Sequence, residues 1–268
     1  MGLQFQGIKI ILVFGLLVLS ANVQSKLTET SSLLYIDWCP QICIEDKTMD
    51  GYIVEVFDLV SEQLDIDFKK EVVPWSRGIV DVNNGKALAL AAPAKAEAPT
   101  LVYPKIPIGI QKMCFFVEAS STWRYVDTDS LMSRQIGVAN ETSIEELNDF
   151  RLSHPELFQA QPYHERFLEQ NVGKLLKKRI DTFIFTRNSM LYYLDHSPYK
   201  GQIKEVGCVS SSPVYIAFSP HQSLKEISAA VSSAFDQQMI VIANNGKLDE
   251  VLSHYNVSFT SADLLNLR

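Results

Sequence analysis

The sequence predicts an α/β protein built as two similar lobes, each a mainly parallel sheet flanked by helices. Between residues 51 and 107, a helix, a strand, a second helix and a second strand follow one another in short units. A similar series recurs between residues 112 and 218, and the proline-containing segment 99–107 stands between the two. Because parallel strands need crossover connections, this alternation favours two α/β units joined by two crossings of the chain. A cleft between two such units is a typical place for a small ligand.

Apolar residues at period two predict strands, and apolar residues at helical spacing predict helices. Before the crossing, the pattern predicts strands over 33–38, 66–72 and 87–91 and helices over 57–64 and 75–82. After it, the pattern predicts strands over 112–117, 135–139, 181–185 and 214–218 and helices over 143–150, 167–178, 188–194, 224–242 and 248–255. Ser143 and Glu146 form a capping box at the first of these later helices. The strand at 214–218 is expected to return the chain to the first lobe.

Residues 1–25 have the pattern of a cleaved export signal. Lys9 supplies the positive start, residues 10–19 form the apolar stretch, and small residues precede a cleavage point before Lys26. The alternative, an uncleaved membrane anchor, is disfavoured because this apolar run is shorter than the about 20 residues that span a bilayer. The mature chain is therefore expected to be soluble and exported, without stable membrane insertion.

The charge balance excludes some classes of partner. The chain has 24 basic and 31 acidic side chains, and removal of the signal takes away one lysine and no acid. A mature chain with this acidic excess is not expected to bind nucleic acid or an anionic membrane surface.

Four cysteines, Cys39, Cys43, Cys114 and Cys208, suggest disulfides in an exported chain and allow three pairings. Cys39 and Cys43 are one residue too far apart for a redox CxxC motif, and no histidine pair accompanies them at zinc-ligand spacing. We expect structural bridges rather than a metal site, with unpaired buried thiols as the alternative. The expected pairs are Cys39–Cys43 and Cys114–Cys208, because the latter two lie near the proposed crossings.

Short strings along the mature chain carry a family resemblance. They are Gly51-Tyr52, Pro74-Trp75-Ser76-Arg77, Gly85, Pro104, Pro107, Trp123-Arg124-Tyr125, Ser130-Leu131, Ile136-Gly137-Val138, Leu175-Leu176, Arg179-Ile180-Asp181, Ala217-Phe218-Ser219-Pro220 and Asn245-Gly246-Lys247-Leu248. In this order the chain resembles the family 3 periplasmic solute-binding proteins of bacterial amino-acid ABC transporters, which have the type II periplasmic-binding fold. The resemblance implies a periplasmic monomer with a two-strand hinge and a ligand between the lobes. It implies one lobe from 26–108 and 214–268 and a second from 109–213.

Two departures from the family bear on the ligand. Where the amino-acid binders have an arginine that clamps the ligand carboxylate, this chain has Glu97. Where they have an aspartate for the ligand ammonium, it has Thr186, followed by Arg187. A bidentate guanidinium and a paired carboxylate recognise a zwitterion. The chain is therefore not expected to bind an ordinary α-amino acid in the usual way.

The candidate ligand-binding residues combine cations, aromatic rings and groups at strand ends: Trp38, Trp75, Arg77, Lys95, Trp123, Asn140, Thr142, Thr186 and Arg187. For each of them a solvated charge or a core aromatic side chain is the competing interpretation. Arg77 and Arg187 are expected to face one another across the cleft. Two guanidinium groups would repel unless an anion lay between them, so this arrangement predicts a small ligand with a carboxylate or similar anion.

Three classes of function stay open. The resemblance favours binding of a small solute for an ABC permease or a membrane sensor, without catalysis, cofactor or metal. An enzyme on the same fold, similar to cyclohexadienyl dehydratase, would need an acid in the cleft, and Glu97 and Glu141 are the obvious candidates. An interaction module that has lost its ligand is the third.

Overall fold

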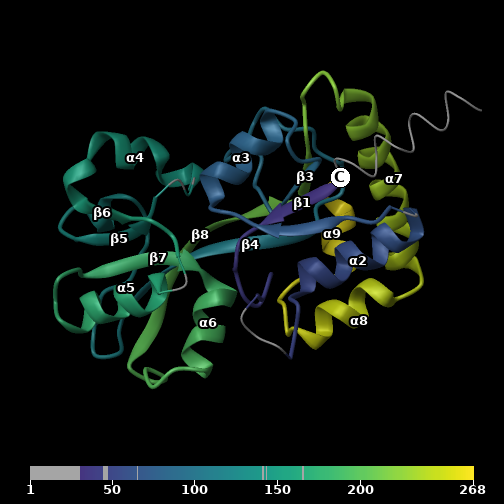
Figure 1. Ribbon diagram of the computed structural model, residues 1–268. Coiled ribbons are helices and arrows are strands. Elements are labelled where there is room, and N and C mark those ends of the chain that lie inside the picture. Colours follow the sequence, from purple (N-terminus) through teal and green to yellow (C-terminus); the bar gives the residue numbers. More distant parts are fainter. Residues whose placement is uncertain (1–30, 45–47, 65, 141, 143, 165) are drawn as a thin grey trace, which may run out of the picture.

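The computed structural model describes residues 31–44, 48–64, 66–140, 142, 144–164 and 166–268 (Figure 1). The predicted export signal, its cleavage point, Glu141 and Ser143 lie outside the described residues. Within the described part, the strands form a four-stranded and a five-stranded sheet flanked by helices, so the predicted α/β fold class is confirmed. None of the described helices combines the length and the apolar character needed to cross a bilayer.

The first sheet has the strand order β2-β1-β3-β9, with β1 at Ser32–Tyr35, β2 at Lys69–Val72, β3 at Ala89–Ala91 and β9 at Ile216–Phe218. β1 pairs in parallel with β2 and β3, and β9 runs antiparallel to β3. Leu33 and Leu34 are both buried but belong to different apolar clusters. Neighbouring residues of a strand point to opposite faces, so this sheet is covered on both sides.

The helices of this lobe are α2 (Tyr52–Leu64), α3 (Trp75–Asn83), α7 (Lys225–Asn244), α8 (Lys247–His254) and α9 (Ser261–Asn266). Helix α3 contacts β1 and β3, α7 contacts β9, and α2 packs against α7 and α8. Figure 1 shows α3 on the opposite side of β1 from α2 and α8. Phe57 of α2 and Phe235 of α7 meet in the core, with ring centroids 6.4 Å apart.

The second sheet has the order β6-β5-β7-β4-β8, with β4 at Gly109–Glu118, β5 at Ile136–Ala139, β6 at Phe158–Gln161, β7 at Thr182–Thr186 and β8 at Ile203–Val214. β5 is parallel to β6 and β7, whereas β4 is antiparallel to both β7 and β8. This sheet is therefore mixed, because the strands that enter and leave the lobe run side by side in opposite directions.

The second lobe carries the helices α4 (Asn148–Ser153), α5 (Phe167–Leu176) and α6 (Arg187–Asp195) and the 3-10 turns η1 (Asp129–Leu131), η2 (Glu145–Leu147) and η3 (Pro155–Leu157). The predicted capping box includes Ser143 and so falls outside the described residues, and the α-helix of this segment begins at Asn148, after the 3-10 turn η2. The Asn148 side chain accepts the backbone N–H of Ile144 over 3.2 Å, and Glu146 lies in the preceding 3-10 turn.

Strands β4 and β8 pair along their length, from Gly109 opposite Val214 to Glu118 opposite Ile203. They join the two lobes, since β4 follows the first lobe in the chain and β8 leads into β9 (Figure 1). Both predicted cysteine pairs form disulfides, and the Cys114–Cys208 bond connects residues that face one another across these two strands.

Candidate functional site

A cavity of about 60 Å³ lies between the two lobes. It is lined by Ile36, Trp38, Ile42, Trp75, Ala91, Ala92, Glu97, Gln111, Met113, Thr142, Tyr163, Phe185 and Thr186. β3 ends at Ala91 and β7 ends at Thr186, so the carboxyl ends of strands from both sheets contribute to the lining. Open α/β sheets bind ligands at this edge, which makes the cavity the candidate site.

Aromatic side chains form much of the cavity wall. Trp38 is buried at 8% exposure, and Trp75 and Tyr163 are partly buried. The rings of Tyr163 and Phe185 stack with their centroids 5.6 Å apart. Such rings give a ligand a large apolar contact area at little conformational cost.

The loop after β1 places Trp38 in the cavity wall, and both a backbone bridge and a disulfide close this loop. Trp38 and Ile42 form an antiparallel bridge, with the Trp38 N–H donating to the Ile42 carbonyl oxygen over 2.7 Å. The Cys39–Cys43 disulfide closes the same short stretch covalently. Both bridged side chains, Trp38 and Ile42, line the cavity. We conclude that the bridge fixes two wall residues of the site.

The polar lining groups are Glu97, Gln111, Thr142 and Thr186. Glu97 Oε2 accepts the backbone N–H of Ala94 over 3.0 Å, and the Glu97 N–H donates to the Ala94 carbonyl oxygen, also over 3.0 Å. The Thr186 hydroxyl donates to Met113 Sδ over 3.5 Å. Gln111 is buried at 7% exposure. The site therefore offers one anchored carboxylate and several neutral polar groups.

The backbone at Ala92 is strained where it borders the cavity. Its φ of 66° lies in the left-handed region, which a side chain with a Cβ rarely adopts. The Ala92 N–H donates to the Tyr215 carbonyl oxygen over 2.7 Å, so a neighbouring segment holds it there. Such conformations gather at functional sites.

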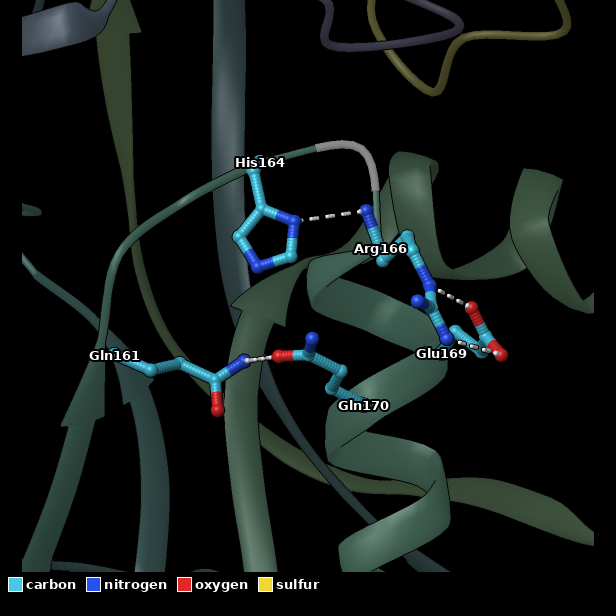
Figure 2. Close-up of polar contacts among 5 residues, drawn as sticks. All are labelled: Gln161, His164, Arg166, Glu169 and Gln170. Carbon is cyan, nitrogen blue, oxygen red and sulfur yellow. Dashed lines mark hydrogen bonds and ion pairs between the residues drawn. The ribbon is translucent and has the colours of Figure 1, made fainter.

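Tyr163 lies in the segment between β6 and α5, which polar contacts hold in place (Figure 2). Gln161 Nε2 donates to Gln170 Oε1 over 3.2 Å, across the segment. His164 Nδ1 accepts the backbone N–H of Arg166 over 3.2 Å. These contacts fix the chain on both sides of Tyr163 as it enters the cavity wall.

The structure brings Trp38, Trp75, Thr142 and Thr186 together in the lining, whereas Arg77 and Arg187 lie outside it. Arg77 Nε pairs with Asp81 Oδ2 over 3.2 Å within α3, and its side chain is 70% exposed. Arg187 Nε pairs with Glu205 Oε2 over 2.7 Å, within the second lobe. Each guanidinium is thus paired with a carboxylate of its own lobe and neither borders the cavity, so the structure gives no support to the predicted pair of cations across the cleft. The prediction of an anionic ligand loses its geometric basis.

The other predicted residues also lie outside the lining. Lys95 Nζ lies 4.7 Å from the ring centroid of Tyr215. Trp123 packs edge-on against Phe115 in the second lobe, and its Nε1 donates to the Ser130 carbonyl oxygen over 3.1 Å. The Asn140 N–H donates to the Gln161 carbonyl oxygen over 2.8 Å.

Several residues of the cavity lining were not predicted from the sequence as ligand contacts. They are Ile36, Ile42, Ala91, Ala92, Gln111, Met113, Tyr163 and Phe185. Gln111 and Met113 follow the crossing after Pro107, and this position could have pointed to the cleft. Tyr163 lies between regular elements, and no periodicity marks it.

The chain matches no family model and no curated protein, but solved structures with the same fold are numerous. The arginine-, lysine-, histidine-binding protein ArtJ of Geobacillus stearothermophilus matches with TM-score 0.70 and 15% identity, over 88% of this chain and 100% of that one. A histidine kinase sensor domain with similarity to periplasmic binding proteins matches with TM-score 0.69 and 13% identity, over 85% and 97%. A probable amino-acid ABC transporter extracellular-binding protein of Bacillus subtilis, ytmK, matches with TM-score 0.63 and 18% identity, over 85% and 98%. The chain therefore has the type II periplasmic-binding-protein fold that its sequence predicts.

Proposed function

We propose that this chain is exported to the periplasm and captures a small organic solute in the cavity between its lobes, without converting it. The observation that carries the proposal is the shared lining, in which Trp38 and Glu97 of one lobe and Gln111 and Thr186 of the other border the same space. A ligand there would contact both lobes and stabilise their closure.

The ligand-loaded protein would then deliver the solute to an ABC permease or present it to a membrane sensor. Both partners have support among proteins of similar fold, because one is a component of a probable amino-acid ABC transporter and another is the sensor domain of a histidine kinase. We take the first lobe as residues 26–108 and 214–268 and the second as 109–213. This division is supported by the two sheets, because β1, β2, β3 and β9 form one sheet and β4 to β8 form the other.

Binding is favoured over catalysis by the chemistry of the lining. Glu97 is the titratable carboxyl group among the described lining residues, and none of these is a histidine, cysteine or lysine. Acid–base catalysis usually needs a partner group of matched pKa. An enzyme of dehydratase type is the second candidate, since Glu97 supplies an acid in the cleft.

Tryptophan fluorescence tests the proposal, because Trp38 and Trp75 line the cavity while Trp123 packs in the second lobe. Mass spectrometry of solute released from denatured native protein identifies candidate ligands. Adding the ligand back to stripped protein should change the emission, and Trp123→Phe should keep that change, whereas Trp38→Phe or Trp75→Phe should reduce it. Turnover of the recovered compound would indicate an enzyme. Absence of any retained solute and of any fluorescence response to a metabolite pool would indicate an interaction module.

A further inference from the structure

We infer that the cavity selects a small flat ring compound that carries a carboxamide or a ring lactam, and that the Gln111 amide binds this group. The inference rests on the proposed function, because it names the ligand class of the same cavity.

The direction of the Gln111 side chain is the first step. Gln111 and Met113 line the cavity, whereas Ile110 and Lys112 border a different pocket. Successive side chains of a strand point to opposite faces, so β4 directs Gln111 and Met113 toward the cavity. Pairing with β8 holds this part of the strand, where Gln111 lies opposite Ser212.

The Gln111 amide is buried without a partner, which is the second step. The residue is only 7% exposed, and no described residue hydrogen-bonds its side chain. The amide offers one acceptor oxygen and two N–H donors. Buried polar groups are normally hydrogen-bonded, and a missing partner is costly. A ligand that brings a donor and an acceptor side by side would satisfy this amide.

Carboxamides and lactams have this pair of groups, because their N–H lies next to their carbonyl oxygen. Two parallel hydrogen bonds can then form, one from the Gln111 N–H to the ligand oxygen and one from the ligand N–H to Gln111 Oε1. Glutamine makes the same two-point contact with the edge of a nucleobase. The Thr186 hydroxyl donates to Met113 Sδ, so its oxygen can accept a further ligand N–H.

A carboxylate fits this site poorly. It has no N–H to donate to Gln111 Oε1. None of the described lining residues is a lysine, arginine or histidine, so a carboxylate would also lack a counter-charge there. Burial of a charge without a counter-charge is unfavourable.

Aromatic side chains from both lobes favour a flat ligand. Trp38 and Trp75 border the cavity from the first lobe, and Tyr163 and Phe185 border it from the second. The rings of Tyr163 and Phe185 are nearly parallel, with 13° between their planes. Such rings pack well against another ring, in stacked or edge-on contact. The cavity volume of about 60 Å³ corresponds to roughly four to six water-sized positions, which suits one ring with a small substituent.

Isothermal titration calorimetry with matched ring compounds tests the inference. Benzamide and uracil carry a carboxamide and a lactam on a flat ring. Acetophenone and 1,3-dimethyluracil keep the rings and carbonyl oxygens but lack the N–H donors. Benzoate replaces the amide of benzamide by an anion, and cyclohexanecarboxamide places the amide on a ring that is not flat. We expect benzamide or uracil to bind at least about tenfold more tightly than its own analogues, the scale of one lost hydrogen bond to a buried amide.

Variants of Gln111 link the preference to the residue. Gln111→Met keeps the length of the side chain but removes the amide, and it should weaken binding of the preferred compound by about 10- to 100-fold. Because the amide has no partner in the protein, this variant should not lower the urea midpoint of the ligand-free protein. Gln111→Glu keeps an acceptor but loses both N–H donors, and it should weaken binding as well. Gln237→Met, at an exposed position of α7, should change neither affinity nor midpoint.

Several outcomes overturn the inference. These are binding of neither benzamide nor uracil, equal binding of the preferred compound and its analogue without N–H donors, tighter binding of benzoate, or an affinity unchanged in Gln111→Met. A lowered urea midpoint in Gln111→Met would give the amide a structural role instead. If the solute released from native protein has no flat ring with an amide, the ligand class is wrong and the binding function stands. If no solute is retained and fluorescence never responds, the binding function itself fails.

Discussion

The Tyr163 hydroxyl donates a hydrogen bond to the backbone carbonyl oxygen of Asp37 over 2.8 Å, and so connects the second lobe to the loop after β1. A second buried bond crosses the same boundary, where Gln41 Nε2 donates to Ser189 Oγ over 3.2 Å. Burial raises the pKa of the Tyr163 hydroxyl well above its ordinary value, so it stays a donor at physiological pH. Both bonds require the lobes to be close together and therefore stabilise the closed arrangement.

Tyr163→Phe should weaken ligand binding, because it removes this bond while the ring stays in the cavity wall. The expected loss is about 0.5–1.5 kcal/mol, or roughly 2- to 12-fold in Kd. Calorimetry with the solute recovered from native protein measures it. Tyr125→Phe is the control, since Tyr125 packs against Phe115 within the second lobe. Equal affinities for the wild-type protein and Tyr163→Phe would show that the bond does not contribute to closure.

Gly51→Ala should destabilise the fold by more than about 2 kcal/mol. The φ of Gly51 is +94°, and an added Cβ would lie 2.5 Å from the Gln41 carbonyl oxygen and 2.6 Å from Ile42 Cα, both backbone atoms. Gly173→Ala is the matched control, because nothing lies within 4 Å of its added Cβ and it lies in α5. The control should raise the free energy of unfolding by about 0.5–1 kcal/mol in urea titrations. A neutral effect at Gly51 would contradict the close approach of the two segments.

Removal of the Cys114–Cys208 bond by a double alanine variant should cost more stability than removal of the Cys39–Cys43 bond. The sequence separations are 94 and 4 residues. In the chain-entropy description, these correspond to about 4–5 and about 2 kcal/mol of lost stabilisation. Denaturant unfolding of the two variants measures the difference. The reverse order would indicate that native-state packing outweighs the effect on the unfolded chain.

Asp81 should make stability depend on pH. Its hydrogen bond with Lys86, assisted by the one with Arg77, lowers the pKa of the Asp81 carboxyl below its ordinary value. A lowered folded-state pKa gives stability that is present above the unfolded pKa of about 3.9 and is lost as pH falls through the folded value. Asp81→Asn should therefore lower the free energy of unfolding by up to about 1 kcal/mol at pH 7, since both cations are exposed. The difference from wild type should shrink as pH falls and vanish once the Asp81 carboxyl is protonated in the folded state as well. A difference that persists in fully acidic solution would exclude this ion pairing as its cause.

The sequence predicted correctly those helices whose apolar residues recur at helical spacing without interruption. The helices predicted over 75–82 and 224–242 are observed at Trp75–Asn83 and Lys225–Asn244. The strand predicted over 214–218 corresponds to β9 and the last residue of β8, whereas residues 203–213 of β8 were not predicted as a strand. Its Ser-Ser-Ser-Pro stretch at 210–213 has no apolar alternation. The strand is stabilised by long-range pairing with β4, which no local pattern contains.

Residues of the cavity lining were singled out from the sequence where a side chain follows a predicted strand, as with Trp38, Trp75 and Thr186. A lining residue was missed where the contact depends on how the lobes meet, as with Tyr163. Arg77 was misassigned although its partner Asp81 stands four residues later, a spacing at which opposite charges on a helix attract. That pattern was visible in the sequence and favoured a helix-surface ion pair over a ligand contact for Arg77.

The Cys114–Cys208 bond turns the stretch from residue 114 to residue 208 into a covalent ring. A protease cut anywhere inside that ring leaves one molecule, which separates into fragments only after reduction. Bending between the lobes is also confined, because each strand has only a short length between the ring and the first lobe: residues 109–113 of β4 and 209–213 of β8. Under the proposed function, closure of the lobes on a ligand would have to act through these two short tethers.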